Sequence, residues 1–378
     1  MRLLLATALL ISAPPAAAQR VDLARVLAEL EPEIHRQMVD GRIPSLTIAL
    51  VDADSILWVG AYGYANLWSR TPAVPSTVYL IGSTFKAMST AALLQQMELG
   101  KFQLDDPVNR YAGDLKIRDE RPGQPVTFRH LVTHTSGLPG AFGPAPVWGD
   151  GAPLPLVEYL QRDLAVVSAP LDSVRYSNLA FSLIGYLVER FSGVPYKQYI
   201  REQIWKPLGM TSTDFNPTPA MDERLAMPYD SDSTGRPIPA VRLKANVWPA
   251  GIVYGTIGDQ ANWLIMNLNG GGFRGKQLLK PATVRAMQTR QHDRFAGAMA
   301  GGWGNEGSGY GLTWWTMTRN GERYIAHSGS VPGYTAFVHG NVDRRHGAVI
   351  LSNGNRAHPY LVRIVNRATD LMAANGIH

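Results

Sequence analysis

Strand-like segments occupy both ends of this 378-residue chain, and helical patterns fill its middle. The strand-like segments are rich in β-branched and aromatic residues, and one pair flanks Asn320-Gly321, the strongest short hairpin signal. They cover residues 46–51, 56–64, 312–319, 322–326, 334–342 and 348–352. Because short turns join neighbouring members of each group, the sequence predicts antiparallel hairpins from both ends of the chain that meet in one sheet.

Helical patterns flank and separate these strands. They lie at residues 21–38, 127–133, 153–164, 178–191, 195–204, 256–268 and 360–374. The first and the last predict terminal helices beside the sheet, and Thr256 and Asp259 have the spacing of a capping box. We therefore expect an α/β (α+β) fold, in which an antiparallel sheet flanked by helices carries a mostly helical inserted lobe.

We expect two lobes of one domain, because the sequence contains no internal repeat and no low-complexity linker. The domain would cover residues 19–378. Its sheet lobe would take about 19–80 and 300–378, and its helical lobe about 81–299. Residues 211–250 are rich in loop signals and receive no element assignment.

The first 18 residues have the pattern of a secretory signal peptide. Arg2 precedes an apolar run at 3–11, and Ala16-Ala17-Ala18 forms a small-residue cleavage site. The run is shorter than the roughly 20 residues that cross a bilayer, and no later stretch is long enough. We expect cleavage after Ala18, export to the periplasm and no membrane span; a retained N-terminal anchor is the alternative.

Composition excludes several classes of function. The chain has no cysteine, which excludes disulfides, thiolate nucleophiles and Cys-bound zinc. Charged residues make up only 17%, which fits a large buried interior. The net charge of +6 comes from Lys and Arg that are scattered without basic runs, so we expect no nucleic-acid partner.

Ser83 begins the only Ser-x-x-Lys sequence in the chain, and Lys86 lies three residues after it. An apolar, Ala-rich run follows and ends at Gly100, so Ser83 should lie in the first turn of a buried helix. Residues three apart share a helix face, which brings the Lys86 amine to the Ser83 hydroxyl. A serine hydroxyl needs such a base to act as a nucleophile. The same spacing also occurs without catalysis, so residues elsewhere must support the interpretation.

Tyr176 and Asn178 form a Tyr-x-Asn sequence just before the apolar helix predicted at 178–191. A tyrosine near a lysine can lose its proton more easily and act as a base or proton shuttle, and Asn178 could hold both Lys86 and a substrate amide. A core tyrosine with an asparagine cap is the alternative. The other copy, at Tyr64, is rejected because it lies on a predicted strand ahead of the serine.

His327, Gly329 and Ser330 lie on or just after the strand predicted at 322–326, in the only His-x-Gly sequence of the chain. An edge strand beside the Ser83 helix could pair with an extended substrate. The backbone N–H of Ser330 would then join that of Ser83 as a second oxyanion donor. A strand-end histidine in a glycine-rich turn is the alternative.

These three motifs, in this order, resemble the active-site motifs of the serine β-lactamase and penicillin-binding-protein superfamily. The resemblance is closest to the branch that holds class C β-lactamases, DD-peptidases, D-aminopeptidases and related esterases, and it extends from about Gly41 to Asn353. It implies acyl transfer through Ser83, with Lys86 and Tyr176 moving protons and Asn178, His327, Gly329 and Ser330 binding substrate. It implies no cofactor.

His327 departs from the class C β-lactamases, which carry lysine there, and a histidine binds a substrate carboxylate less firmly. We therefore expect an exported serine hydrolase that acts on an amide or ester of a small molecule or peptide, including cell-wall-derived ones, like a DD-peptidase or D-aminopeptidase. A carboxylesterase or class C-like β-lactamase is one alternative, and a slowly deacylating penicillin-binding sensor is another. His130 and His134 are four residues apart, but H-E-x-x-H is not formed, so we expect no metal and a bracing role for His134.

Overall fold

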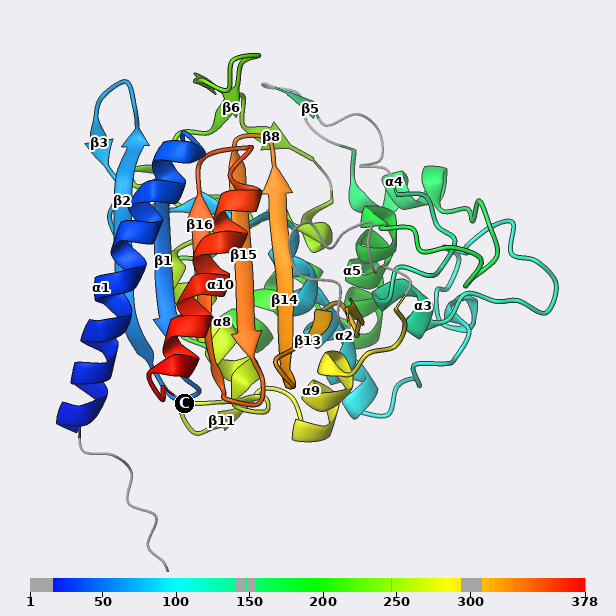
Figure 1. Cartoon of the computed structure of the whole chain (residues 1–378). Helices are drawn as coiled ribbons and strands as arrows, with labels where there is room; N and C mark the ends of the chain where they lie inside the picture. Colours follow the sequence, from blue (N-terminus) through cyan, green and yellow to red (C-terminus); the bar gives the residue numbers. More distant parts are fainter. Residues whose placement is uncertain (1–15, 141–146, 149–153, 246, 294–307, 378) are drawn as a thin grey trace, which may run out of the picture.

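An eight-stranded antiparallel sheet forms the centre of the protein. The computed structural model describes residues 16–140, 147–148, 154–245, 247–293 and 308–377. The strand order is β12-β13-β14-β15-β16-β1-β2-β3, so strands from the two ends of the chain join where β1 pairs with β16 (Figure 1). The strands are β1 (Ser45–Val51), β2 (Ile56–Asn66), β3 (Thr71–Pro72), β12 (Gly309–Tyr310), β13 (Trp315–Arg319), β14 (Glu322–Val331), β15 (Tyr334–Asn341) and β16 (His346–Ser352).

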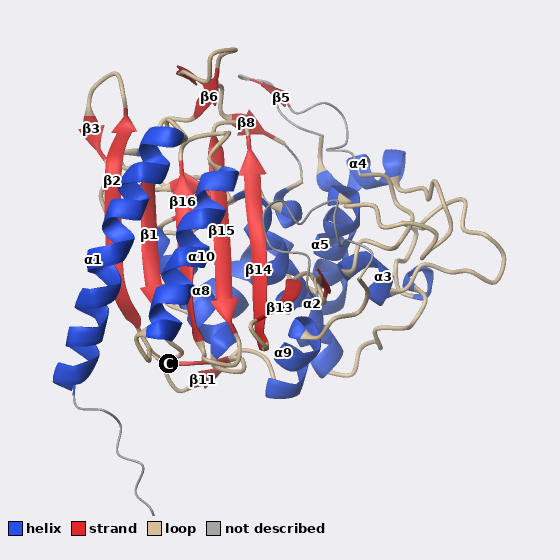
Figure 2. Ribbon diagram, in the orientation of Figure 1, coloured by secondary structure: helices blue, strands red, loops and turns tan. Residues whose placement is uncertain are grey.

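Helices cover both faces of the sheet. The terminal helices α1 (Ala16–Asp40) and α10 (His358–Ala374) lie side by side over one face, and α8 (Ile257–Leu268) packs on the other (Figure 2). Strand β1 shows how the sequence supports both layers: Ile48 and Leu50 belong to the core beneath α1 and α10, whereas Ala49 and Val51 belong to the core with α8. A strand buried on both faces therefore has a continuous apolar sequence.

The remaining helices form the lobe beside the α8 face (Figure 2). They are α2 (Lys86–Glu98), α3 (Phe128–Val132), α4 (Leu156–Asp163), α5 (Asn178–Ser192), α6 (Tyr196–Ile200), α7 (Pro219–Asp222) and α9 (Pro281–Gln288), with short helices at η1 (Gly82–Phe85), η2 (Val108–Arg110), η3 (Arg201–Trp205) and η4 (Trp248–Ala250). Two-residue or three-residue strands pair as β4 (Tyr79–Leu80) with β9 (Tyr254–Gly255), β5 (Val147–Trp148) with β8 (Leu243–Lys244), β6 (Tyr229–Ser231) with β7 (Pro237–Pro239), and β10 (Gly272–Phe273) with β11 (Lys276–Gln277).

The predicted architecture is confirmed, and one local prediction, the capping box at Thr256, is wrong. Thr256 caps α8 without a side-chain hydrogen bond, because Asp259 instead accepts bonds from the Ser212 N–H and the Thr213 hydroxyl, both at 2.8 Å. The helix predicted at 195–204 is α6 followed by a π-helical turn, η3. The hairpin around Asn320-Gly321 is confirmed, and both residues have positive φ as its turn requires.

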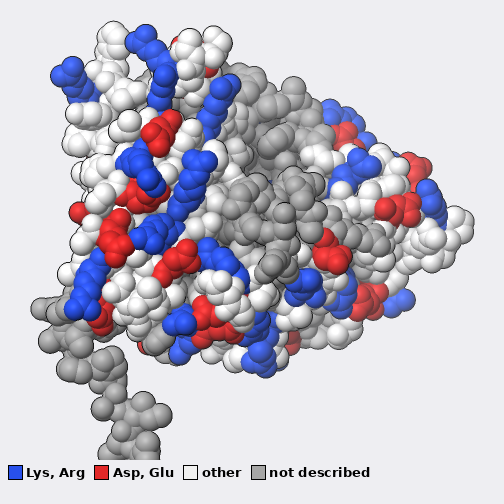
Figure 3. Space-filling view, in the orientation of Figure 1, with Lys and Arg blue, Asp and Glu red and all other residues white. Residues whose placement is uncertain are grey.

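The signal peptide remains a prediction, because residues 1–15 lie outside the described residues and Ala16–Ala18 belong to the first turn of α1. Among the described helices, none combines the length and the apolar character that a membrane crossing needs. Figure 3 shows basic and acidic side chains intermingled over the face that α1 and α10 form.

Candidate active site

Ser83 lies at the junction between the sheet-side strand β4 and the buried helix α2. The prediction of a first helical turn is nearly right: Ser83 belongs to the 3₁₀ turn η1, and α2 begins three residues later at Lys86. Backbone pairing of Leu80 with Tyr254 and an Ile81 N–H bond to the Val253 carbonyl (2.9 Å) fix the chain just before Ser83. The Ser83 side chain is partly exposed, so a substrate can reach it.

Lys86 is the one fully buried lysine of this junction. Its Nζ donates to Ser83 Oγ at 2.9 Å and to the carbonyl oxygen of Ala250 at 2.6 Å. Burial lowers the pKa of Lys86 well below its ordinary value. A neutral amine beside a serine hydroxyl can accept its proton, which is the requirement for a general base.

The loop at Ala250 and Gly251 is a part of the site that sequence reasoning missed. Ala250 supplies only a backbone carbonyl, and no residue type marks such an acceptor in a sequence. Gly251 has φ +143°, and a Cβ there would lie 2.6 Å from the Gly82 carbonyl and 2.9 Å from the Ser83 nitrogen. The loop therefore packs directly on the turn that carries Ser83, and a glycine at this position is the only detectable signal.

Tyr176 lies across from Lys86, whose Nζ is 4.8 Å from the centre of the phenol ring. Burial raises the pKa of Tyr176, against a hydrogen bond with Ser83 that lowers it. The expectation that Tyr176 loses its proton more easily is therefore wrong: in the folded protein the phenol keeps its proton. A protonated phenol beside the serine can donate a hydrogen bond or a proton to a leaving group.

His134 positions Tyr176, which confirms its predicted bracing role. The two rings pack with centroids 4.2 Å apart and a 30° angle between their planes, and His134 Nδ1 accepts the Ser177 N–H at 3.0 Å. Ser177 caps α5 by accepting the Ala180 N–H at 3.1 Å. His130 has a separate structural role, because its Nδ1 accepts the Thr127 N–H in a capping box that starts α3.

Asn178 is buried in the first turn of α5, two residues after Tyr176. The structure does not join it to Lys86: the two hydrogen bonds of the Lys86 amine to described residues go to Ser83 and Ala250. Asn178 is near the site because it lies only two residues after Tyr176 in the chain. Its contact with a substrate amide remains a prediction.

Strand β14 passes directly beside the Ser83 turn. It extends from Glu322 to Val331, further than predicted, so His327, Gly329 and Ser330 lie within the strand. Its pairing with β13 ends at Ala326, and among the described residues the following segment pairs only with β15. This segment is therefore a local edge that could accept an extended substrate.

The approach of β14 to the turn is backbone to backbone. A Cβ on Gly329 would lie 2.1 Å from the Ile81 carbonyl oxygen, and a Cβ on Gly82 would lie 3.1 Å from the Ser330 nitrogen. Only glycines permit this contact. It brings the Ser330 backbone nitrogen next to the turn that carries Ser83. An oxyanion hole formed by the backbone N–H groups of Ser83 and Ser330 remains a prediction.

His327 is buried at the base of this edge. Its Nδ1–H donates to the Ser328 carbonyl at 2.7 Å, and its ring stacks on Trp315 at 5.4 Å. Burial, with the nearby Lys86 charge as the second cause, lowers the pKa of His327 to about 3. His327 is therefore neutral at physiological pH and offers a substrate a hydrogen bond rather than a positive charge.

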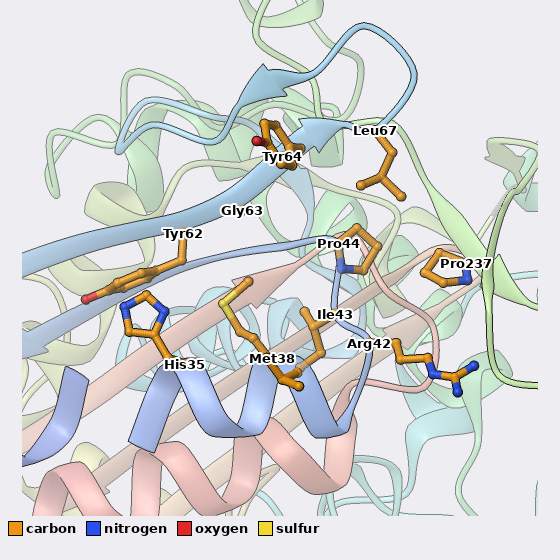
Figure 4. A pocket seen from close by; sticks show the side chains of 11 residues that line it. His35, Met38, Arg42, Ile43, Pro44, Tyr62, Gly63, Tyr64, Leu67 and Pro237 are labelled. Atoms are coloured by element: carbon orange, nitrogen blue, oxygen red, sulfur yellow. The ribbon is translucent and has the colours of Figure 1, made fainter. Parts of the chain in front are cut away.

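A groove with a volume of about 400 Å³ lies elsewhere, between the end of α1, strand β2 and Pro237 (Figure 4). Tyr64, the rejected Tyr-x-Asn copy, lines this groove and lies on β2 as predicted. None of the residues that hold Ser83 or Lys86 lines it. Among the described residues, no group of three or more His, Cys, Asp or Glu side chains could hold a metal ion.

Comparison with known proteins gives a consistent picture. The sequence profile of the Beta-lactamase family matches residues 30–369. "Protein flp" of Staphylococcus aureus (strain NCTC 8325 / PS 47) is 24% identical over 89% of this chain and 65% of its own length. "Unguisins hydrolase ungD'" of Aspergillus campestris is 31% identical over 80% of this chain and 57% of its own length. The chain therefore spans less than two thirds of these curated relatives.

Solved structures share the fold. The octameric penicillin-binding protein homologue from Pyrococcus abyssi superposes with a TM-score of 0.77 at 27% identity, covering 92% of this chain and 77% of that one. EstCE1, a hydrolase with promiscuous acyltransferase activity, gives 0.73 at 22% identity, covering 93% and 100%. The D-amino acid amidase from Ochrobactrum anthropi SV3, complexed with D-phenylalanine, gives 0.73 at 21% identity, covering 92% and 99%.

The family profile covers most of the chain, and the structure matches the fold of these proteins. The chain therefore belongs to the Beta-lactamase family, in the class C-related branch of the serine β-lactamase and penicillin-binding-protein superfamily.

Proposed function

We propose that the protein is a serine hydrolase that cleaves an amide or ester through an acyl-Ser83 intermediate, in the manner of a DD-peptidase or D-aminopeptidase. The observation that carries this proposal is the 2.9 Å contact between Ser83 Oγ and the buried amine of Lys86, whose pKa is lowered well below its ordinary value. A hydroxyl next to an amine that is easily deprotonated is an activated nucleophile.

The proposed reaction follows from the positions of the side chains. Ser83 Oγ attacks the carbonyl carbon, Lys86 accepts the hydroxyl proton, and the backbone N–H groups of Ser83 and Ser330 stabilise the oxyanion. Tyr176 gives its phenol proton to the leaving amine or alcohol as the bond between that group and the carbonyl carbon breaks, and Lys86 restores the proton to Tyr176. A water molecule then attacks the acyl-Ser83 ester and releases the acid.

The choice between substrate classes rests on His327. A neutral histidine at the local edge of β14 would accept a hydrogen bond from an amide N–H of the donor through Nε2, and it lacks the charge that a lysine would offer to a carboxylate. Names among the relatives include a hydrolase of unguisins, a D-amino acid amidase and EstCE1, a hydrolase with acyltransferase activity. They support amide and ester donors, and we rank amides of peptides first.

The test is a substrate panel on wild type and Ser83→Ala, with D-amino acid 4-nitroanilides, a 4-nitrophenyl ester and a fluorescent penicillin. We expect Ser83→Ala to lose at least about 10³-fold in kcat/KM on every cleaved compound, because the nucleophile is removed. Mass spectrometry of the trapped wild-type adduct should place the acyl group on Ser83.

Each alternative predicts a different pattern. Cleavage of the ester alone would identify an esterase, and durable penicillin labelling of Ser83 without turnover would identify a sensor. Undiminished activity in Ser83→Ala would overturn the proposal. Export to the periplasm through residues 1–18 is also a proposal, and N-terminal sequencing of the secreted protein tests it by locating the first residue.

A further inference from the structure

A second pocket lies next to the loop that holds Lys86. It has a volume of about 440 Å³, and it is enclosed by α6, the chain after Phe215, β8, η4 and β9. A volume in this range is typical of pockets for small-molecule groups. The mechanism derived above uses none of its side chains.

The buried part of this pocket's lining is apolar. Buried side chains line it, and Tyr254 and Phe215 add aromatic surface. The other buried members are Leu243, Ala245 and Ile252. Such a wall favours an aliphatic or aromatic body in a ligand, because apolar surface gains free energy when it leaves water.

The rim of the pocket is cationic. Lys197, Arg242 and Lys244 line it, and no acidic residue is among the described lining residues. Arg242 is paired with Asp222 at 2.9 Å, whereas Lys197 has no ion-pair partner within the described part of the chain. The Lys197 Nζ lies 4.2 Å from the centre of the Trp248 ring and 5.6 Å from that of Phe215, so the aromatic rings hold its ammonium at the pocket.

One loop lies between the pocket and the turn that carries the reacting serine. Trp248 and Ile252 line it, and between them Ala250 accepts the Lys86 hydrogen bond while Gly251 packs on the Ser83 turn. Consecutive Cα atoms are about 3.8 Å apart. The pocket wall therefore begins one residue from the backbone that contacts the Ser83 nitrogen.

We propose that this pocket binds a negatively charged group of the acyl donor, with an apolar stem against Ile252 and Tyr254 and a terminal carboxylate at Lys197. The inference rests on the proposed function, since it adds a preference for anionic acyl groups to the Ser83 reaction. Neutral His327 and cationic Lys197 would then divide recognition, the first binding the donor backbone and the second its side group.

The test compares two esters that differ only in charge: the mono-4-nitrophenyl ester of adipic acid and the same compound with its far carboxylate capped as a methyl ester. We expect wild type to prefer the charged ester. In Lys197→Met the ratio of the two kcat/KM values should fall about tenfold, the effect of losing one charge-assisted hydrogen bond. Hydrolysis of the capped ester should stay within about twofold.

Two further variants serve as controls. Lys197→Arg keeps the positive charge and should retain most of the preference. Lys276→Met removes an exposed lysine on the β11 hairpin, outside the lining of this pocket, and should leave the ratio unchanged. An unchanged ratio of the two kcat/KM values in Lys197→Met would overturn the inference. An equal loss of kcat/KM for both esters would overturn it too, because it would mean that Lys197 only supports the Trp248 loop.

A binding measurement separates this inference from the proposed function. Isothermal titration should show that Ser83→Ala binds the charged adipate ester. The double variant Ser83→Ala/Lys197→Met should bind it with an affinity about tenfold weaker. Both results are expected whether or not the wild type hydrolyses the ester. Absence of binding overturns the pocket assignment. Full hydrolysis by Ser83→Ala overturns the proposed function. The binding result then still decides whether the pocket at Lys197 binds the charged group.

Discussion

At the scale of single residues, Lys86 determines the chemistry. Its amine is buried, has no carboxylate partner among its described hydrogen bonds, and binds only Ser83 and a backbone carbonyl. Burial without an opposite charge favours the neutral form of an amine. The same environment that makes Lys86 a base therefore makes its protonated form unfavourable in the fold.

We predict that Lys86→Met loses about 10²–10⁴-fold in kcat/KM, the usual range for a general base. In wild type, kcat/KM should rise with pH through the lowered pKa of Lys86, and Lys86→Met should lose this limb. His327→Gln should keep the limb in place, because the pKa of His327 is about 3 and its ring does not titrate in this range. A pH profile of kcat/KM for the three proteins is the measurement.

The same substitution should also affect stability. Below the ordinary value of 10.5 the unfolded chain keeps a proton on Lys86, whereas the folded chain releases it at lower pH. Between those two pKa values the unfolded state binds more protons, so stability from this group rises with pH. Lys86→Met removes the free-energy cost of deprotonating Lys86 on folding. The Tm of this variant near pH 7 should therefore equal or exceed that of wild type. Retained activity in Lys86→Arg, which cannot deprotonate, would contradict the role of a base.

The residues that could be predicted here are those whose chemistry resides in a side chain. Ser83 and Lys86 were found because a spacing of three places them on one face, and His327 because of its glycine-rich strand. Ala250 could not be found, since a carbonyl acceptor is present at every position. The pKa direction of Tyr176 was predicted wrongly because burial, which a sequence does not show, outweighs the hydrogen bond with Ser83.

At the scale of elements, the site depends on three backbones in contact: the turn η1, the strand β14 and the loop after η4. Some caps and turns of the protein can be predicted from residue type, and others cannot. Asn320-Gly321 marks its hairpin by residue type, whereas the α3 capping box uses His130 in place of the usual Glu or Gln. Asp259 matches the capping spacing but binds Ser212 and Thr213, because tertiary partners were available.

We predict that Gly329→Ala reduces kcat by about 10²–10³-fold, the effect of displacing one oxyanion donor. Its new methyl carbon would lie 2.1 Å from the Ile81 carbonyl oxygen, so β14 must move away from the Ser83 turn. Gly258→Ala is the matched control, since that α8 position has open space and ordinary helix backbone. Steady-state kinetics of both variants measures the effect, and circular dichroism verifies that they fold. Equal kcat values for Gly329→Ala and Gly258→Ala would refute the argument that β14 must contact the Ser83 turn closely.

At the scale of the whole molecule, helix α1 completes the core over one face of the sheet. Val26, Leu30 and Ile34 are fully buried there against α10 and the strands. The helical spacing of apolar residues made both terminal helices predictable. The runs of β-branched and aromatic residues made the strands of the sheet predictable. The paths of residues 211–250 were not, because a short strand such as β8 owes its pairing to β5, which lies far away along the chain.

We predict that deletion of residues 1–18 leaves the Tm unchanged, whereas deletion of residues 1–40 prevents stable folding. The longer deletion removes the burial of Val26, Leu30 and Ile34, which contributes about 5 kcal/mol or more, a large share of a typical total. Thermal unfolding of both truncated proteins measures the difference. A longer truncation that melts like the full chain would contradict the role given to α1.

The pairing of β1 with β16 has a consequence for biosynthesis. Leu46 pairs with Ser352, so the middle of the sheet closes between segments roughly 300 residues apart. A ribosome must therefore synthesise the chain as far as β16 before the β1–β2 hairpin gains this partner, and until then β1 exposes an unpaired apolar edge. Closure of the sheet is consequently a late event in synthesis, and the β1 edge needs shielding until β16 has been made.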